Sequence, residues 1–241
     1  MQYIVLDVET TGLSSNDEVI QMSAMFLNKT FDTCSEVINF YCMPTAPISH
    51  GAAAVHHLTL SKLKELSNLR FFESYFYPLS KKFSEDCTFI AYSDSGFDFR
   101  LINQTLARAG LPAYDFGEKI KKLDDGLHGH HTFDLMSAMA RYGGLRWNKI
   151  KLENALKLLP NYNKEDLEIK YMNFSRIIDK QDTAEGQVDL FHNARFDTFS
   201  LWYILNNVGD RFGALCRIIY QHSLICPLPT SCCKQADDSN S

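Results

Sequence analysis

Two acidic residues, Asp7 and Glu9, end a short apolar run near the start of the 241-residue chain. Residues i and i+2 of a strand point to the same face, so both carboxylates are expected to project together. Two like charges at a core edge repel each other and lose hydration, and a hard divalent cation compensates both effects through carboxylate oxygens. The spacing alone is equally compatible with a metal site and with a solvated strand end.

Two later stretches offer groups of the same kind. An apolar run at 89–91 is followed by Phe97-Asp98, and further on a His precedes an Asp by five residues in Phe191-His192-Asn193-Ala194-Arg195-Phe196-Asp197. Carboxylates that converge in space can hold two cations, and a His beside them can take a proton from water. Such a set suits the hydrolysis of a phosphodiester, whose leaving oxygen needs stabilisation.

In this order, the motifs resemble those of the DEDDh 3′–5′ exonucleases, the superfamily of proofreading and RNase T-like exonucleases. The resemblance covers roughly residues 1–208, and shorter matches are Ile20-Gln21-Met22-Ser23-Ala24, Pro47-Ile48 and Val55-His56-His57-Leu58-Thr59. The chain departs from the family pattern at Gln21, at His57 and at Ser93-Asp94, where Glu, Gly and His-Asn are usual.

The resemblance implies a two-metal site with two divalent cations, Mg²⁺ or Mn²⁺, and with His192 as the general base. Asp94 competes with Asp98 for the third carboxylate, and Asp98 is preferred because the Phe-Asp pair carries the resemblance. A sister subgroup has Tyr where this chain has Asn193, so the His subgroup fits better. The implied metal ligands are Asp7, Glu9, Asp98 and Asp197.

The same resemblance implies where the 3′-terminal nucleotide binds. Leu13 would wedge against the base, and backbone groups of the three preceding residues, Thr10, Thr11 and Gly12, would contact the nucleotide. Gly12 has a separate reason, because a residue without Cβ lets a phosphate or sugar approach closely, although a plain turn explains it equally well. His56 and Phe97 are further pocket candidates that could instead be core residues.

The amino-acid composition narrows the possible classes of function but does not identify one. Hydrophobic content of 45% and charged content of 22% are ordinary for a globular protein, and seven Cys without metal-like spacing indicate reduced thiols. The net charge of −5 argues against a broad basic nucleic-acid face but not against a nuclease. Three local clusters of lysines could attract a nucleic-acid strand, or could simply be part of a solvated charged surface. They are Lys81-Lys82, Glu118-Lys119-Ile120-Lys121-Lys122 and Lys149-Ile150-Lys151.

Strand and helix patterns indicate an α/β, RNase H-like fold with a mixed central sheet. Apolar runs broken by turn residues predict three antiparallel N-terminal strands at 3–8, 18–28 and 35–43, and a strand at 87–92. Flanking helices are predicted at 59–66, 70–84, 96–109, 132–142, 151–159, 192–207 and 210–223.

We expect one exonuclease domain over residues 1–224. Residues 161–190 are polar and weakly periodic, so they are interpreted as an insertion that could form a loop over the active site. Residues 225–241 are expected to be a disordered tail.

The leading hypothesis is a 3′–5′ exonuclease that releases nucleoside 5′-monophosphates from single-stranded ends, with DNA preferred. An exoribonuclease that trims RNA or degrades oligoribonucleotides is the alternative, and an inactive nucleic-acid or polymerase-binding module is the second. A homodimer or a polymerase partner stays open. We expect no membrane association and a cytoplasmic location, because no signal peptide or long apolar run is present.

Overall fold

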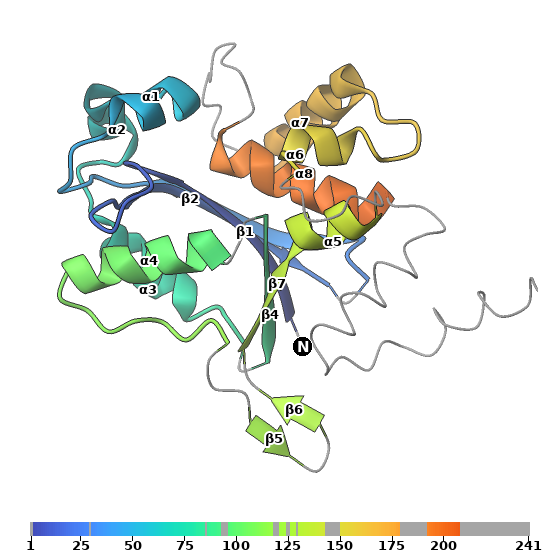
Figure 1. The fold of residues 1–241 in the computed structure, drawn as a ribbon, viewed down its shortest axis with the longest axis horizontal. Helices are drawn as coiled ribbons and strands as arrows, with labels where there is room; N and C mark the ends of the chain where they lie inside the picture. The colour runs from blue at the N-terminus through green and yellow to red at the C-terminus, as the bar shows by residue number, and fades with distance from the viewer. Residues whose placement is uncertain are drawn as a thin grey trace, which may run out of the picture.

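A five-stranded mixed sheet forms the centre of the protein (Figure 1). The computed structural model describes residues 2–28, 30–84, 86–92, 96–117, 121–123, 126–128, 130–142, 150–178 and 192–207. The sheet order is β3-β2-β1-β4-β7. The first three strands pair antiparallel, whereas β4 lies parallel to β1 and to β7. The strands are β1 (Gln2–Thr10), β2 (Val19–Leu27), β3 (Cys34–Tyr41), β4 (Cys87–Ala91) and β7 (His130–Asp134).

Alternation along β1 divides the core into two layers. Ile4 and Leu6 pack in one layer with α3 (Phe72–Ser80) and α4 (Phe97–Arg108). Tyr3 and Val5 pack in the other layer, which the four helices after β7 cover. Those helices are α5 (Leu135–Tyr142), α6 (Leu152–Leu156), α7 (Lys164–Ile178) and α8 (Ala194–Asn207). Side chains of a strand alternate between its two faces. Asp7 and Glu9, the odd-numbered residues that follow Val5, therefore point toward the layer of α8.

The pairing of β1 with β2 changes register directly after Glu9. Glu9 pairs with Gln21, but Thr10 pairs with Val19, so the extra residue at this irregularity is Ile20 of β2. β1 ends at Thr10, so its acidic end passes directly into the loop that connects it to β2.

Two short helices and a hairpin lie at opposite ends of the sheet in Figure 1. The side chain of Ser49 caps α1 (His50–His56), and that of Thr59 caps α2 (Leu60–Leu66). Such caps satisfy backbone N–H groups that the first helical turn leaves without partners. The hairpin consists of β5 (Lys121–Leu123) and β6 (Gly126–His128).

The expected fold class is confirmed, with local corrections. The predicted helix at 132–142 begins only at Leu135, because residues up to Asp134 form the parallel edge strand β7. The weakly periodic region 161–190 contains the helix α7 rather than a loop over its described part. Leu167 and Tyr171 of α7 are buried in the layer of α8, which explains why this polar segment is helical. The predicted helix at 210–223 and the tail lie outside the described residues.

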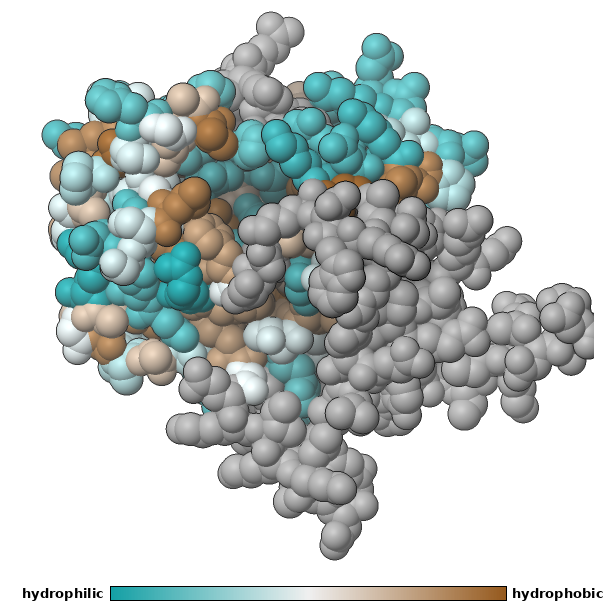
Figure 2. All heavy atoms as spheres, in the orientation of Figure 1, coloured by the Kyte–Doolittle hydropathy of each residue, from teal (hydrophilic) through white to brown (hydrophobic). Residues whose placement is uncertain are grey.

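The part of the chain that the structure describes holds no helix long and apolar enough to cross a membrane. Figure 2 shows mostly hydrophilic side chains on the visible surface of the α6–α7 region. The buried apolar residues of these two helices face the sheet, as expected for amphipathic helices that cover one face of a sheet.

Candidate active site

Three carboxylates converge where the end of β1 meets the start of α8. Asp7 and Glu9 lie on the β1 face that points toward α8, and Asp197 lies in the first turn of that helix. One oxygen from each of the three carboxylates lies within 4.8 Å of the other two. An all-oxygen set at this separation could hold a hard divalent cation.

Asp98 joins this group from the other layer. It is the second residue of α4, follows Gly96 in a left-handed conformation (φ 70°), and is only 3% exposed. A cavity of about 380 Å³ is lined by all four carboxylates and by His192. Asp94, the competing choice for the third carboxylate, lies outside the described residues.

Burial and mutual repulsion dominate the electrostatics of the carboxylates. Burial raises the pKa of Asp7 well above its ordinary value, and the nearby Asp98, Asp197 and Glu9 raise it further. The pKa of Glu9 is also raised well above its ordinary value, first by burial and then by Asp197 and Asp98. Such shifts mean that the ionised cluster is unfavourable without positive charge beside it.

His192 lies directly before α8 and lines the cavity. Its backbone is left-handed (φ 63°), and its N–H donates to Asp197 Oδ2 at 3.1 Å. The imidazole is exposed at the cavity rather than packed in the core. An imidazole at the cavity wall is a group that can accept a proton from water.

The N-terminus of α8 is attached to the sheet through a buried amide. Gln21, on β2 opposite Glu9, is fully buried and donates to Asn39 Oδ1 (3.0 Å) and to Asn193 Oδ1 (3.2 Å). Its Oε1 accepts from the Ala194 N–H at 3.4 Å. Asn193 Oδ1 also accepts from the backbone N–H of Arg195 at 3.1 Å. These bonds fix the position of α8, and thus of Asp197, relative to Glu9.

The loop after Glu9 is held by hydrogen bonds to its carbonyl groups. The Thr10 carbonyl lies 3.1 Å from His56 Nε2, and the Thr11 carbonyl accepts from the Ser49 N–H at 2.8 Å. Thr10 Oγ1 donates to the Gly12 carbonyl at 2.7 Å. Leu13 is 77% exposed beside this ordered backbone. The backbone N–H groups of Gly12 and Leu13 have no partner among the described residues.

Gly12 lacks a side chain for a reason inside the loop. A Cβ at this position would lie 2.7 Å from Asp17 Oδ2. The Asp17 carboxylate is held there because it accepts from Thr11 Oγ1 at 2.8 Å and from the Ser14 N–H at 2.6 Å. The expected close approach to a phosphate or sugar is therefore not needed to explain this glycine.

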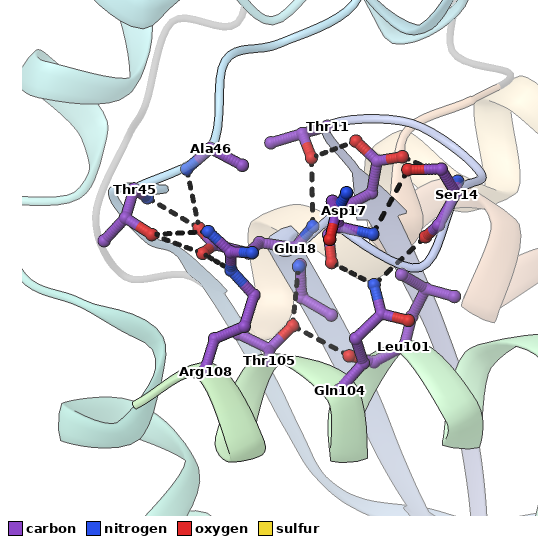
Figure 3. Close-up of polar contacts among 12 residues, drawn as sticks. Thr11, Ser14, Asp17, Glu18, Thr45, Ala46, Leu101, Gln104, Thr105 and Arg108 are labelled. Atoms are coloured by element: carbon purple, nitrogen blue, oxygen red, sulfur yellow. Dashed lines mark hydrogen bonds and ion pairs between the residues drawn. The ribbon is translucent and has the colours of Figure 1, made fainter. Parts of the chain in front are cut away.

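Helix α4 fastens the far side of the same loop, as Figure 3 shows. Gln104 Nε2 donates to the carbonyls of Ser14 and Asp17. Arg108 pairs with the buried carboxylate of Glu18, which also accepts from the Thr45 and Ala46 N–H groups. Because Asp98 belongs to this helix too, α4 connects the fourth carboxylate to the loop that carries Leu13.

The two remaining pocket candidates differ in what they contact. His56 is buried, and its Nδ1 accepts from the Leu58 N–H at 3.0 Å, so its Nε2–H donates to Thr10. Burial lowers the pKa of His56, which agrees with a neutral ring. His56 therefore supports the loop and does not line the carboxylate cavity. Phe97 does line that cavity, beside Asp98.

A family model described as exonuclease, of the RNase T group, matches residues 4–201. The chain belongs to this exonuclease family. It is a nuclease of the DEDDh type with the RNase H-like fold that its motifs indicate.

Relatives of known sequence or structure agree with this assignment. A PolC-type DNA polymerase III from Ureaplasma parvum is 28% identical over 110 residues, which are 45% of this chain and 7% of that protein. A zinc-bound E. coli ExoI–ssDNA complex has a TM-score of 0.64 at 18% identity and covers 92% of this chain and 43% of its own. E. coli exonuclease I with a dA16 oligonucleotide has a TM-score of 0.61 at 16% identity, with the same coverage. The exonuclease described here thus spans less than half the length of these relatives, and the structural likeness shows the shared fold.

Sequence reasoning missed the second wall of the exonuclease cavity. Tyr92, Met136 and the segment 150–153 line the same cavity as the carboxylates. Only the Lys149-Ile150-Lys151 cluster was noted, and its charge gave no sign of proximity to Asp7. Of the other two clusters, Lys82 pairs with Glu36 instead, and the side chains of 118–122 lie outside the described residues.

Proposed function

We propose that this exonuclease hydrolyses single-stranded nucleic acid from the 3′ end, with DNA preferred, and releases nucleoside 5′-monophosphates. The convergence of Asp7, Glu9, Asp98, Asp197 and His192 at one cavity carries the proposal. The complexes of E. coli ExoI with single-stranded DNA support DNA as the polymer. The RNA-trimming reading uses the same chemistry and differs only in substrate.

The proposed metal ligands are Asp7, Glu9, Asp98 and Asp197. Their clustered oxygens and raised pKa values fit divalent cations, because bound positive charge removes the repulsion between buried carboxylates. Two Mg²⁺ or Mn²⁺ ions bound there would supply the charge that activates the attacking water and stabilises the leaving 3′ oxygen.

His192 is the proposed general base, which takes the proton from the attacking water at the cavity wall. Leu13 is proposed to contact the terminal base, because its side chain is 77% exposed on a loop whose backbone is held in place. The Gly12 and Leu13 N–H groups are proposed to bind the terminal nucleotide, while Thr10, Thr11 and His56 shape this loop.

The test is a gel assay with 5′-labelled single-stranded DNA and RNA of one sequence, with Mg²⁺, with Mn²⁺ and with EDTA. We expect metal-dependent shortening from the 3′ end, faster on DNA, and nucleoside 5′-monophosphates by mass spectrometry. Faster cleavage of RNA would favour the exoribonuclease reading. No shortening of either polymer under any metal would refute the proposal and favour an inactive binding module.

His192→Ala is expected to lower kcat by about 10²–10⁴-fold, the usual contribution of a general base. Because the side chain is exposed, the variant should fold with an unchanged melting temperature. His50→Ala, at an exposed position at the start of α1, is the matched control and should keep the wild-type rate. A His192→Ala enzyme within twofold of wild type would contradict the assignment of the base.

A further inference from the structure

The lining of the carboxylate cavity also carries a cation. Lys151 lines the cavity that also contains Asp7, Glu9, Asp98 and Asp197. Among the described residues of this lining, it is the one lysine or arginine. Its side chain is exposed and forms no ion pair or hydrogen bond with the described residues. A charge in this position is available to a ligand that enters the cavity.

The backbone of Lys151 is held in place from three sides. Lys151 precedes α6 in an extended conformation, and its carbonyl accepts from the N–H groups of Asn154 (2.9 Å) and Ala155 (3.0 Å). The carbonyl of Ile150 accepts from Tyr92 Oη at 2.7 Å, which ties this segment to the end of β4. Ile150 and Leu156 are buried in the core on either side. The backbone that carries the lysine is therefore well supported.

The charge balance of the cavity shows what this lysine can bind. The wall of β1, α4 and α8 contributes four carboxylates, and Glu153 adds another carboxylate to the lining. A nucleic-acid strand brings one negative charge for each phosphate, so an acidic cavity repels every phosphate that no cation neutralises. Lysine is a compact point charge that suits a phosphate without demanding a fixed geometry.

We propose that Lys151 binds a backbone phosphate of the substrate strand next to the phosphate being hydrolysed. This rests on the proposed function, and it adds a specific residue that makes the enzyme prefer a polynucleotide over a single nucleotide ester. The carboxylate cluster would hold the cations that serve the scissile phosphate, whereas Lys151 lines the cavity from a separate element, directly before α6. The neighbouring phosphate thus gains its counter-charge from the protein.

The experiment compares Lys151→Ala with Lys157→Ala, since Lys157 is an exposed lysine at the other end of α6 that does not line the cavity. Two substrates are used: a single-stranded 20-mer of DNA and the p-nitrophenyl ester of thymidine 5′-monophosphate, which carries one phosphate. For Lys151→Ala we expect kcat/KM on the 20-mer to fall about 3–10-fold, the range for one partly exposed charge contact, with the ester rate unchanged.

Salt dependence gives a second readout that a structural defect would not produce. The plot of log(kcat/KM) against log[NaCl] for the 20-mer should become less steep by about 0.7, the value for one phosphate contact on a single strand. Lys157→Ala should keep the wild-type slope, and Lys151→Arg should restore it because the charge remains. An unchanged slope in Lys151→Ala, or an equal loss on the ester, would overturn the proposal.

A binding measurement separates this proposal from the proposed function. Fluorescence anisotropy of a labelled single strand in Ca²⁺ gives the salt slope without turnover. If the wild-type protein binds DNA but hydrolyses no substrate, the proposed function fails while the slopes of wild type and Lys151→Ala still decide the role of Lys151. Equal slopes in this measurement would refute that role whether or not the chain is active.

Discussion

At the scale of single residues, the loop after β1 depends on the absence of one side chain. Gly12 leaves room for the Asp17 carboxylate, which two hydrogen bonds from Thr11 and Ser14 hold in place. Those bonds, with Arg108 nearby, lower the pKa of Asp17, although its partial burial acts in the opposite direction. The ionised Asp17 carboxylate thus helps to hold the loop that carries the exposed Leu13.

Gly12→Ala is expected to destabilise the protein by about 1–3 kcal/mol, the usual range for overpacking. The new Cβ would lie 2.7 Å from an Asp17 oxygen that cannot move without losing its hydrogen bonds. Urea unfolding measures the change. Gly51→Ala is the matched control, because nothing lies within 4 Å of its Cβ position in α1, and helix propensity predicts a gain of up to about 1 kcal/mol. Equal stability of Gly12→Ala and wild type would show that the loop rearranges freely.

At the scale of elements, one buried amide joins β2, β3 and α8. Gln21 contacts Asn39 on one side and the first residues of α8 on the other. Its position opposite Glu9 means that a single side chain sets the distance between the acids of β1 and the acid of α8. Helix α4 has the matching role on the other layer, where Gln104 and Arg108 hold the loop after β1.

Gln21→Leu is expected to lower kcat at least about tenfold while KM changes little, because His192 and Asp197 lose their fixed position and a 1 Å displacement can cost about 100-fold. Unpaired polar groups at Asn193 and Ala194 should also cost about 1–3 kcal/mol of stability. Steady-state kinetics well below the melting temperature separate the two effects.

Asn39→Ala is the control for this variant. It breaks the other hydrogen bond of Gln21 but leaves the bonds to α8, so kcat should stay near the wild-type value. If both variants lose kcat equally, the amide serves general stability rather than the placement of α8.

At the scale of the whole molecule, the two core layers meet at a cluster of partly and fully buried acids. Asp7 and Glu9 lie on the face of β1 that packs on α8, whereas Asp98 arrives from the layer of α4. Folding therefore brings like charges together, and their raised pKa values record that cost. Bound divalent cations should recover part of it, so metal binding and folding are coupled.

In the metal-free protein, the acid cluster should become less destabilising as the pH falls toward the ordinary pKa values of Asp7 and Glu9, whereas the lowered pKa of the buried His56 costs stability below its ordinary value of 6.5. The pKa values of Asp7 and Glu9 are raised in the folded state, so above the ordinary pKa values of 3.8 and 4.5 the folded protein binds more protons than the unfolded chain. Stability then falls as pH rises through this window. The lowered pKa values of Asp17 and Glu18 act in the opposite direction, and their contribution is lost only at more acidic pH.

Thermal melts at pH 6 and pH 8, with EDTA and with Mg²⁺, test this coupling. Mg²⁺ should raise the melting temperature most at pH 8. Asp7→Asn should be more stable than wild type in EDTA at pH 8, should gain less from Mg²⁺, and should lose activity. A metal-free melting temperature that does not rise between pH 8 and pH 6 would contradict the repulsion between these acids.

Much of this protein follows from local patterns in the sequence. The alternation in β1 places Asp7 and Glu9 on one face, and the spacing from His192 to Asp197 places both at the start of one helix, because strand and helix periods depend on near neighbours alone. The three N-terminal strands were predicted correctly for the same reason. By contrast, β7 was read as part of a helix and α7 as part of a loop, since distant partners decide their conformation.

The sequence by itself predicted the chemical groups of the proposed site: four carboxylates, a histidine and a loop that carries a leucine. Only the tertiary structure decided what surrounds them. It placed Gln21 opposite Glu9, filled the space beside Gly12 with Asp17, and brought Lys151 to the cavity that the acids line. These pairings join residues that are far apart in the chain or depend on loop geometry, and no local periodicity encodes such distances.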